Sequence, residues 1–209
     1  MVNVIKIKSN VYESNTFVVT KGKQAIIIDC GADYEQIISS INGFDVKAIF
    51  LTHGHFDHAF YALRYAKEFG AKIYASEYAK ELLCDPAKNY GGYFKIDDFS
   101  NFEFLAGDGK LKIGSFTVKY YATPGHSKCC VSYIVEKELF AGDFLFRDGI
   151  GRMDVFGSSM EQMLESLKKA SKWEFNHCYC GHYEIADNAR MQRNIAVYIR
   201  FLTKKLENN

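Results

Sequence analysis

The segment formed by residues 52–58 constrains the fold of this chain more than any other part of its sequence. It reads Thr-His-Gly-His-Phe-Asp-His and directly follows an apolar run of strand type. Because side chains alternate along a strand, His53 and His55 would lie on the same side of an extended backbone. Asp57 and His58 would then lie where the chain turns into an amphipathic helix. The two pairs project from different backbone geometries and are therefore suited to two adjacent metal ions.

Three later steps of the sequence carry the same kinds of side chain. Residues 123–127 read Thr-Pro-Gly-His-Ser, and the dipeptides Gly142-Asp143 and Gly181-His182 each follow an apolar run. Together with residues 52–58, they resemble the H-x-H-x-D-H signature and the later ligand steps of the metallo-β-lactamase superfamily, in the same order. The alternative is a chance cluster of surface histidines. The pattern, however, uses five of the six histidines and leaves only His177.

This resemblance implies a site for two divalent metal ions. Imidazole and carboxylate ligands suit Zn²⁺ first, but also Fe and Mn. The resemblance also implies a catalytic role for Asp57, which would orient the attacking hydroxide. One metal ion would be held by His53, His55 and His126, and the other by Asp57, His58 and His182, with Asp143 as the bridge.

Two further stretches resemble the glyoxalase II (hydroxyacylglutathione hydrolase) branch of that superfamily. Residues 142–152 match its G-D-x-L-F-x-x-x-x-G-[KR] loop, and residues 179–184 match C-G-H-E-Y with the last two residues transposed. In that branch the basic residue of the loop holds the thiol carrier of the substrate, which by position implies that Arg152 binds substrate. The alternative for Arg152 is a surface salt bridge with Asp148 or Asp154.

The chain also departs from the glyoxalase II pattern. That branch has a Tyr where this chain has Asp154, and its full-length members carry a C-terminal helical domain with further glutathione contacts. We expect residues 1–209 to form one metallo-β-lactamase-like domain without the helical substrate domain. The chain resembles the short bacterial glyoxalase II-like hydrolases, and the carrier thiol is left open.

The activity that this resemblance implies is hydrolysis of a small-molecule thioester. A water bound to zinc has a pKa of roughly 7, so hydroxide is available at neutral pH to attack the thioester carbonyl. A thiol has a pKa of about 8.5, so a thiolate leaving group needs no strong general acid. The main alternative is a persulfide dioxygenase on the same fold, with one iron held by His53, His126 and Asp143.

Other classes fit the sequence less well. A flavodiiron oxidoreductase normally has Glu at the position of His55, and a nuclease would carry a basic insertion. The formal net charge of +1 indicates neither a nucleic-acid partner nor a membrane partner, and no apolar run approaches transmembrane length. The six cysteines lack C-x-x-C spacing. We interpret them as free thiols in a reducing cytoplasm. The sequence does not indicate an oligomeric state.

The order of predicted elements indicates an α/β fold. Each half runs strands and then a helix, which favours two mixed sheets packed face to face with helices outside, the four-layer αββα sandwich of the superfamily. Strands are expected at residues 2–8, 16–20, 25–29, 72–75, 110–113, 116–122, 131–135, 139–141 and 176–180, besides the strand before residue 52. Helices are expected at residues 33–41, 59–69 with Gly70 at its end, 77–84, after a capping box that begins at Ser158, and from about Asp187.

Two features remain open at this stage. Asp29 ends the third strand, where the resemblance places it close behind the metal ions. The alternative is a turn carboxylate satisfied by backbone N–H groups. Residues 85–108 read as irregular chain with a run of aromatic side chains. Such a run either forms a substrate lid or, more commonly, pins a long loop to the core.

Overall fold

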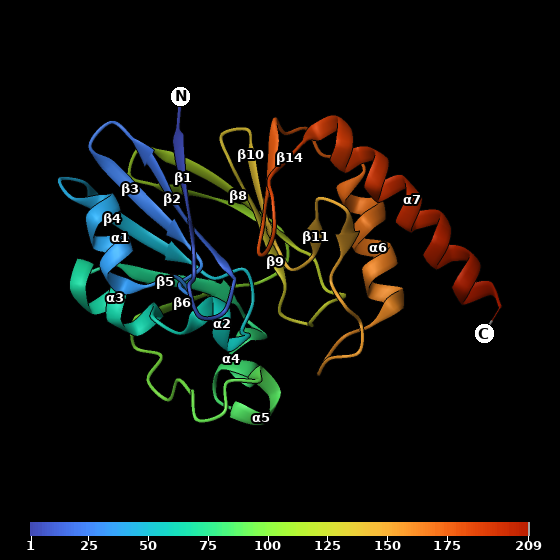
Figure 1. The fold of residues 1–209 in the computed structure, drawn as a ribbon, viewed down its shortest axis with the longest axis horizontal. Helices are drawn as coiled ribbons and strands as arrows, with labels where there is room; N and C mark the ends of the chain where they lie inside the picture. Colours follow the sequence, from blue (N-terminus) through green and yellow to red (C-terminus); the bar gives the residue numbers. More distant parts are fainter. Residues whose placement is uncertain (209) are drawn as a thin grey trace.

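The computed structural model describes residues 1–208, whose strands form two six-stranded sheets and one short hairpin (Figure 1). The first sheet has the order β1-β2-β3-β4-β5-β6. β1 to β3 are antiparallel, whereas β3 to β6 are parallel, so that β3 and β4 end at the same edge. The strands are β1 Asn3–Lys8, β2 Asn15–Lys21, β3 Gln24–Ile28, β4 Asp45–Phe50, β5 Lys72–Ser76 and β6 Phe102–Leu105.

The second sheet has the order β14-β13-β10-β9-β8-β7. The pair β10 and β13 is parallel and the other pairs are antiparallel. Its strands are β7 Gly109–Ile113, β8 Phe116–Ala122, β9 Val131–Val135, β10 Glu138–Gly142, β13 His177–Cys180 and β14 Ala186–Asp187. The hairpin between β11 Leu145–Phe146 and β12 Gly149–Ile150 stands apart from both sheets.

The two sheets pack face to face, and helices cover their outer faces (Figure 1). Buried side chains of both sheets form the central layer, among them Phe17, Phe50, Phe116, Tyr133 and Phe140. α1 and α3 pack on the first sheet, and α6 and α7 pack on the second. This arrangement confirms the predicted αββα sandwich of mixed sheets. The helices are α1 Tyr34–Ile41, α2 Phe56–Ala59, α3 Ala62–Phe69, α4 Ala79–Leu83, α5 Pro86–Asn89, α6 Met160–Ala170 and α7 Asn188–Glu207.

The predicted helix over residues 59–69 is wrong in its first turn. The chain instead forms α2 and α3, because the N–H of Tyr61 donates to the carbonyl of Cys30 at 2.9 Å and leaves the helical path. The predicted end is confirmed, since Gly70 takes the left-handed conformation with φ of 60°. The cap of α6 is Ser159 and not Ser158: its Oγ accepts the N–H of Gln162 at 3.2 Å.

The expectation of an irregular segment over residues 85–108 is also partly wrong. The segment contains α5 and the edge strand β6. Phe94 and Phe99 pack against the core of the first sheet, as expected for a pinned loop, whereas Tyr93 is fully exposed.

The six cysteines are free thiols, as predicted, and five of them are buried. Over residues 1–208 no helix has the length and apolar character needed to cross a membrane.

Candidate metal centre

Residues 53–58 lie at the edge of the sandwich where β4 ends. The backbone of His55 is extended, with φ of −68° and ψ of 146°, and it immediately precedes α2. Asp57 and His58 lie in the first turn of α2. The two pairs of side chains therefore come from an extended segment and from a helix, as the sequence predicts.

The second sheet brings three further side chains to the same edge. His126 lies in the loop between β8 and β9, and Asp143 and His182 follow the parallel strands β10 and β13. Asp143 and His182 each follow a glycine, and no larger residue would fit at either position. A Cβ at Gly181 would collide with Oδ1 of Asp143, and a Cβ at Gly142, where φ is 53°, would collide with the side chain of Thr52. The backbone passes so close to the cluster that only glycine fits.

The predicted ligands form one continuous cluster. Nδ1 of His55 lies 3.0 Å from Nε2 of His53 and 3.1 Å from Nε2 of His126. At the other end, Nε2 of His182 lies 3.2 Å from the carboxylate of Asp57 and 3.5 Å from that of Asp143. Three overlapping groups have their ligand atoms within 4.8 Å of one another: His53, His55 and His126; His53, His58 and Asp143; and Asp57, His58 and His182.

The cluster fits a pair of divalent cations. Oδ1 of Asp143 lies 3.4 Å from Nε2 of His58 and, over residues 1–208, is among the few buried side-chain atoms that lack a hydrogen-bond partner. Buried polar atoms are normally paired, so this carboxylate oxygen in the middle of the cluster points to a missing partner. Imidazole and carboxylate groups together suit Zn²⁺, Fe and Mn. The three groups together could hold two metal ions, with Asp143 between the two ends of the cluster.

Two imidazoles are held neutral and ready to bind a cation. Burial lowers the pKa of His53 well below its ordinary value, and the neighbouring imidazoles of His58 and His55 lower it further. Burial, together with the ring of His126, lowers the pKa of His55 to about 3. A neutral imidazole has a free lone pair, which is the form that binds metals.

The other end of the cluster is ionised. Burial acts to lower the pKa of His58, but Asp57, Asp143 and Asp29 outweigh it and raise that pKa well above its ordinary value. Burial acts to raise the pKa of Asp143, but His58 and His182 hold it well below its usual range. Asp57 has a lowered pKa because the same two histidines outweigh its burial. Both carboxylates are therefore charged at neutral pH.

A cavity of about 260 Å³ opens over the His55 end of the cluster. Arg152 is one of the residues that line this cavity. Its guanidinium also donates two hydrogen bonds to Asp154, at 2.6 and 2.8 Å, and both side chains are about two-thirds exposed. One of the two salt bridges considered from the sequence is thus present. The cavity is lined by Tyr12, His55, Phe56, Asp57, Asn89, Tyr90, His126, Asp143, Arg152 and Val155.

The aromatic wall of this cavity was not predicted from the sequence. Tyr90 adopts φ of 63°, and its ring lies 5.4 Å from the ring of His55. The buried side chain of Asn89 holds this turn by donating to the carbonyls of Leu82 and Phe94. The aromatic run in residues 85–108 was the signal for this wall, but nothing in the run distinguishes Tyr90 from its neighbours.

His177 lies outside the cluster, as predicted. It begins β13 at the other end of the strand from His182, and its Nδ1 lies 3.0 Å from the carboxylate of Glu138.

Comparisons with known proteins agree with this geometry. The model of the metallo-beta-lactamase superfamily matches residues 10–182. A probable metallo-hydrolase of Bacillus subtilis, YqgX, is 32% identical over 162 residues, which are 74% of this chain and 77% of that protein. The hydroxyacylglutathione hydrolase GloC of Haemophilus influenzae is 33% identical over 155 residues, which are 70% and 73% of the two chains. The crystal structure of the BLEG-1 B3 metallo-beta-lactamase superposes with a TM-score of 0.85 and 29% identity, covering 97% of this chain and 100% of that one.

Proposed function

This chain belongs to the metallo-beta-lactamase superfamily and is a metal-dependent hydrolase, and on that basis we propose that it hydrolyses thioesters in the manner of glyoxalase II. The similarity to the hydroxyacylglutathione hydrolase of H. influenzae supports this substrate class. The loop over residues 142–152, which resembles the carrier-binding loop of the glyoxalase II branch, gives a second line of support.

One structural observation carries the proposal. Apart from the cluster itself, the residues that line the cavity over His55 include no carboxylic acid and no histidine. An amine leaving group has to be protonated as it departs, and besides the phenols of Tyr12 and Tyr90, which are weak acids, this lining offers no general acid for that step. A thiolate departs without protonation, because a thiol has a pKa of about 8.5. The chemistry available at the cavity therefore matches a thioester better than an amide.

The assignment of the ligands follows the three groups in the structure. We assign His53, His55 and His126 to one metal ion, Asp57, His58 and His182 to the other, and Asp143 to both, with zinc as the proposed metal. Bound divalent metal ions lower the pKa of a coordinated water to about 7 and polarise the carbonyl of a substrate.

Asp57 is the proposed catalytic residue. Its carboxylate is ionised, lies 3.2 Å from Nε2 of His182, and lines the cavity. An ionised carboxylate accepts hydrogen bonds only, so Asp57 can hold the attacking water by one of its protons and fix its orientation. His126 keeps its Nε2 toward the cluster because its Nδ1 donates to the carbonyl of Arg152 at 2.9 Å.

Arg152 is the proposed contact to the carrier thiol. A guanidinium offers a planar fork of donors that matches a carboxylate or an amide carbonyl. Its present partner, Asp154, is exposed, and an exposed ion pair is weak, so a carboxylate on the substrate can replace it.

The proposal is tested with three substrates that share one acyl group: a thioester, an amide and an oxygen ester. We expect release of free thiol from the thioester and far slower turnover of the amide. Turnover of the amide as fast as that of the thioester would contradict the proposal. Sulfite formation from a persulfide, with consumption of oxygen and no thioester hydrolysis, would favour the dioxygenase instead.

A further inference from the structure

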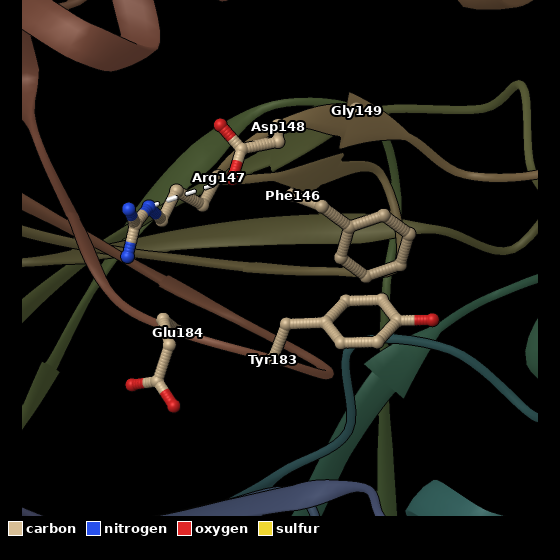
Figure 2. A pocket seen from close by; sticks show the side chains of 6 residues that line it. All are labelled: Phe146, Arg147, Asp148, Gly149, Tyr183 and Glu184. Atoms are coloured by element: carbon tan, nitrogen blue, oxygen red, sulfur yellow. Dashed lines mark ion pairs between the residues drawn. The ribbon is translucent and has the colours of Figure 1, made fainter.

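A second cavity, of about 360 Å³, lies beside Tyr183, the residue that follows His182 (Figure 2). The cavity at Arg152 is lined by His55 and His126 of one end of the cluster and by Asp57 of the other end. The two cavities share no lining residue. The second cavity is lined by Phe146, Arg147, Asp148, Gly149, Tyr183 and Glu184.

Two aromatic rings connect this cavity to the centre. The ring of Phe146 lies 6.2 Å from the ring of His182 and 5.5 Å from the ring of Tyr183. Tyr183 directly follows His182, and Phe146 is three residues beyond Asp143. Figure 2 shows the two rings side by side at one end of the cavity. An apolar surface therefore begins at a metal-site histidine and leads away from it.

Both walls of the cavity are held in place by side chains outside it. Asn194 of α7 donates to the carbonyls of Phe146 and Gly149, at 3.0 and 2.9 Å, and so fixes the hairpin of β11 and β12. The buried side chain of Asn15 donates to the carbonyl of Tyr183 at 3.1 Å. The cavity is therefore formed before any ligand binds, which is typical of small-molecule sites.

The charged side chains lie at the other end of the cavity and have partners of their own (Figure 2). Arg147 lies 3.5 Å from Asp148, which also pairs with Arg190. Glu184 lies 3.5 Å from Lys6. Each charged side chain of the lining thus already takes part in an ion pair. The aromatic end of the cavity favours an apolar group.

We propose that this cavity is the acyl pocket of the enzyme and takes an apolar acyl chain of medium length, an inference that rests on the proposed thioester hydrolysis. The scissile carbonyl then lies over the metal centre, with the acyl chain along Phe146 and Tyr183 and the carrier thiol toward Arg152. A cavity of about 360 Å³ has the volume of about a dozen liquid waters, at roughly 30 Å³ each, so it holds a chain well beyond acetyl.

The test measures kcat/KM of the metal-loaded protein for acetyl, butanoyl and hexanoyl thioesters of one thiol. Full burial of a methylene raises kcat/KM by about fourfold, so we expect a rise of up to that size per added carbon. Tyr183→Ala and Phe146→Ala should each flatten this dependence on chain length. Tyr93→Ala, which removes a fully exposed ring that lines neither cavity, should keep the wild-type dependence. The readout is the slope of kcat/KM against acyl chain length, because a general loss of activity lowers kcat/KM for all three thioesters by the same factor.

Two results would overturn the acyl pocket: a wild-type rate that does not rise with acyl length, or a slope that both variants retain. A rate that rises instead with the chain length of the thiol would place the thiol, and not the acyl chain, in this cavity. That result would equally contradict the proposal. If no thioester is hydrolysed, the proposed function fails and the pocket is tested by binding alone. Hexanoate should then bind the metal-loaded protein more tightly than acetate, and Tyr183→Ala should reduce that preference. Equal binding of the two acids would exclude the pocket.

Discussion

Oδ2 of Asp29 lies 2.8 Å from Nδ1 of His58, in a fully buried contact behind the metal centre. The same carboxylate accepts the N–H and the hydroxyl of Thr52, each at 2.8 Å. Asp29 thus fixes both the ring of His58 and the start of the segment that carries His53. The two roles considered from the sequence, a turn carboxylate and a group close behind the metals, are combined in one side chain.

The variant Asp29→Asn is expected to weaken metal binding while the fold is kept. Asparagine has the same size but lacks the charge that keeps His58 oriented, and loss of such a supporting carboxylate typically costs about 10- to 100-fold in metal affinity. Competition with a chelator measures this affinity. The matched control is Asp33→Asn, since Asp33 hydrogen-bonds Asn10 on the surface. Equal metal affinity of both variants and the wild type would show that Asp29 does not support the site.

Asp143→Ala is expected to abolish thioester hydrolysis and to lower the metal content. Asp143 lies between the two ends of the cluster, 3.4 Å from Nε2 of His58 and 3.5 Å from that of His182. His177→Ala should leave both the rate and the metal content intact, because His177 lies outside the cluster and its ring pairs with Glu138. Loss of activity in the folded His177 variant would overturn the ligand assignment.

Arg152→Ala is expected to lower kcat/KM by about ten- to a hundredfold for a thioester with a carboxylate on its thiol, the effect of one charge-assisted hydrogen bond. The loss should lie mainly in KM, because the contact is the same in the ground and transition states. Asp154→Asn should lower KM for the same substrate, since it removes the competing carboxylate. A thioester of a small neutral thiol is the control. Equal losses on both thioesters would leave Arg152 as one half of a surface salt bridge.

The sequence predicted which side chains gather in the cluster better than it predicted the surrounding cavities, for a physical reason. The seven candidate ligands occur at fixed spacing after strands, and parallel pairing of β10 with β13 brings Asp143 and His182 together. The walls of both cavities depend on contacts between distant segments. Asn194 positions Phe146, and the hydroxyl of Tyr90 accepts the N–H of Phe156 at 2.9 Å. Such contacts leave no periodic pattern in the sequence.

The two errors in the predicted elements have different physical reasons. The apolar periodicity of residues 59–69 is that of a helix, but the hydrogen bond from Tyr61 to Cys30 interrupts it. β6 was missed because it is an edge strand whose middle residues, Glu103 and Phe104, are both exposed, so it lacks the alternation of a half-buried strand.

The metal-free protein is expected to be most stable near about pH 6.5, the ordinary pKa of histidine. His53 and His55 have lowered pKa values in the folded chain. Below about pH 6.5 the unfolded chain binds protons at these two histidines before the folded chain does, so the free energy of unfolding decreases as the pH falls. His58 has a raised pKa, so its contribution is complete below about pH 6.5 and is lost as the pH rises. The free energy of unfolding should therefore decrease both above and below about pH 6.5.

Urea unfolding of the metal-free protein between about pH 5 and pH 8 measures this dependence. His177→Ala is the matched control, because it removes a histidine outside the cluster and should keep the shape of the curve. A free energy of unfolding that rises steadily from about pH 5 to pH 8 would show that His58 is not held protonated.

The most direct test of a dinuclear thioester hydrolase is a metal titration of the metal-free protein, with release of free thiol recorded at each ratio of bound metal to chain. We predict that activity with zinc reaches its plateau at two metal ions per chain, since the seven candidate ligands form two end groups that are joined by a middle group of His53, His58 and Asp143. A plateau at one iron per chain, unchanged by further zinc or manganese and without thiol release, would contradict this account.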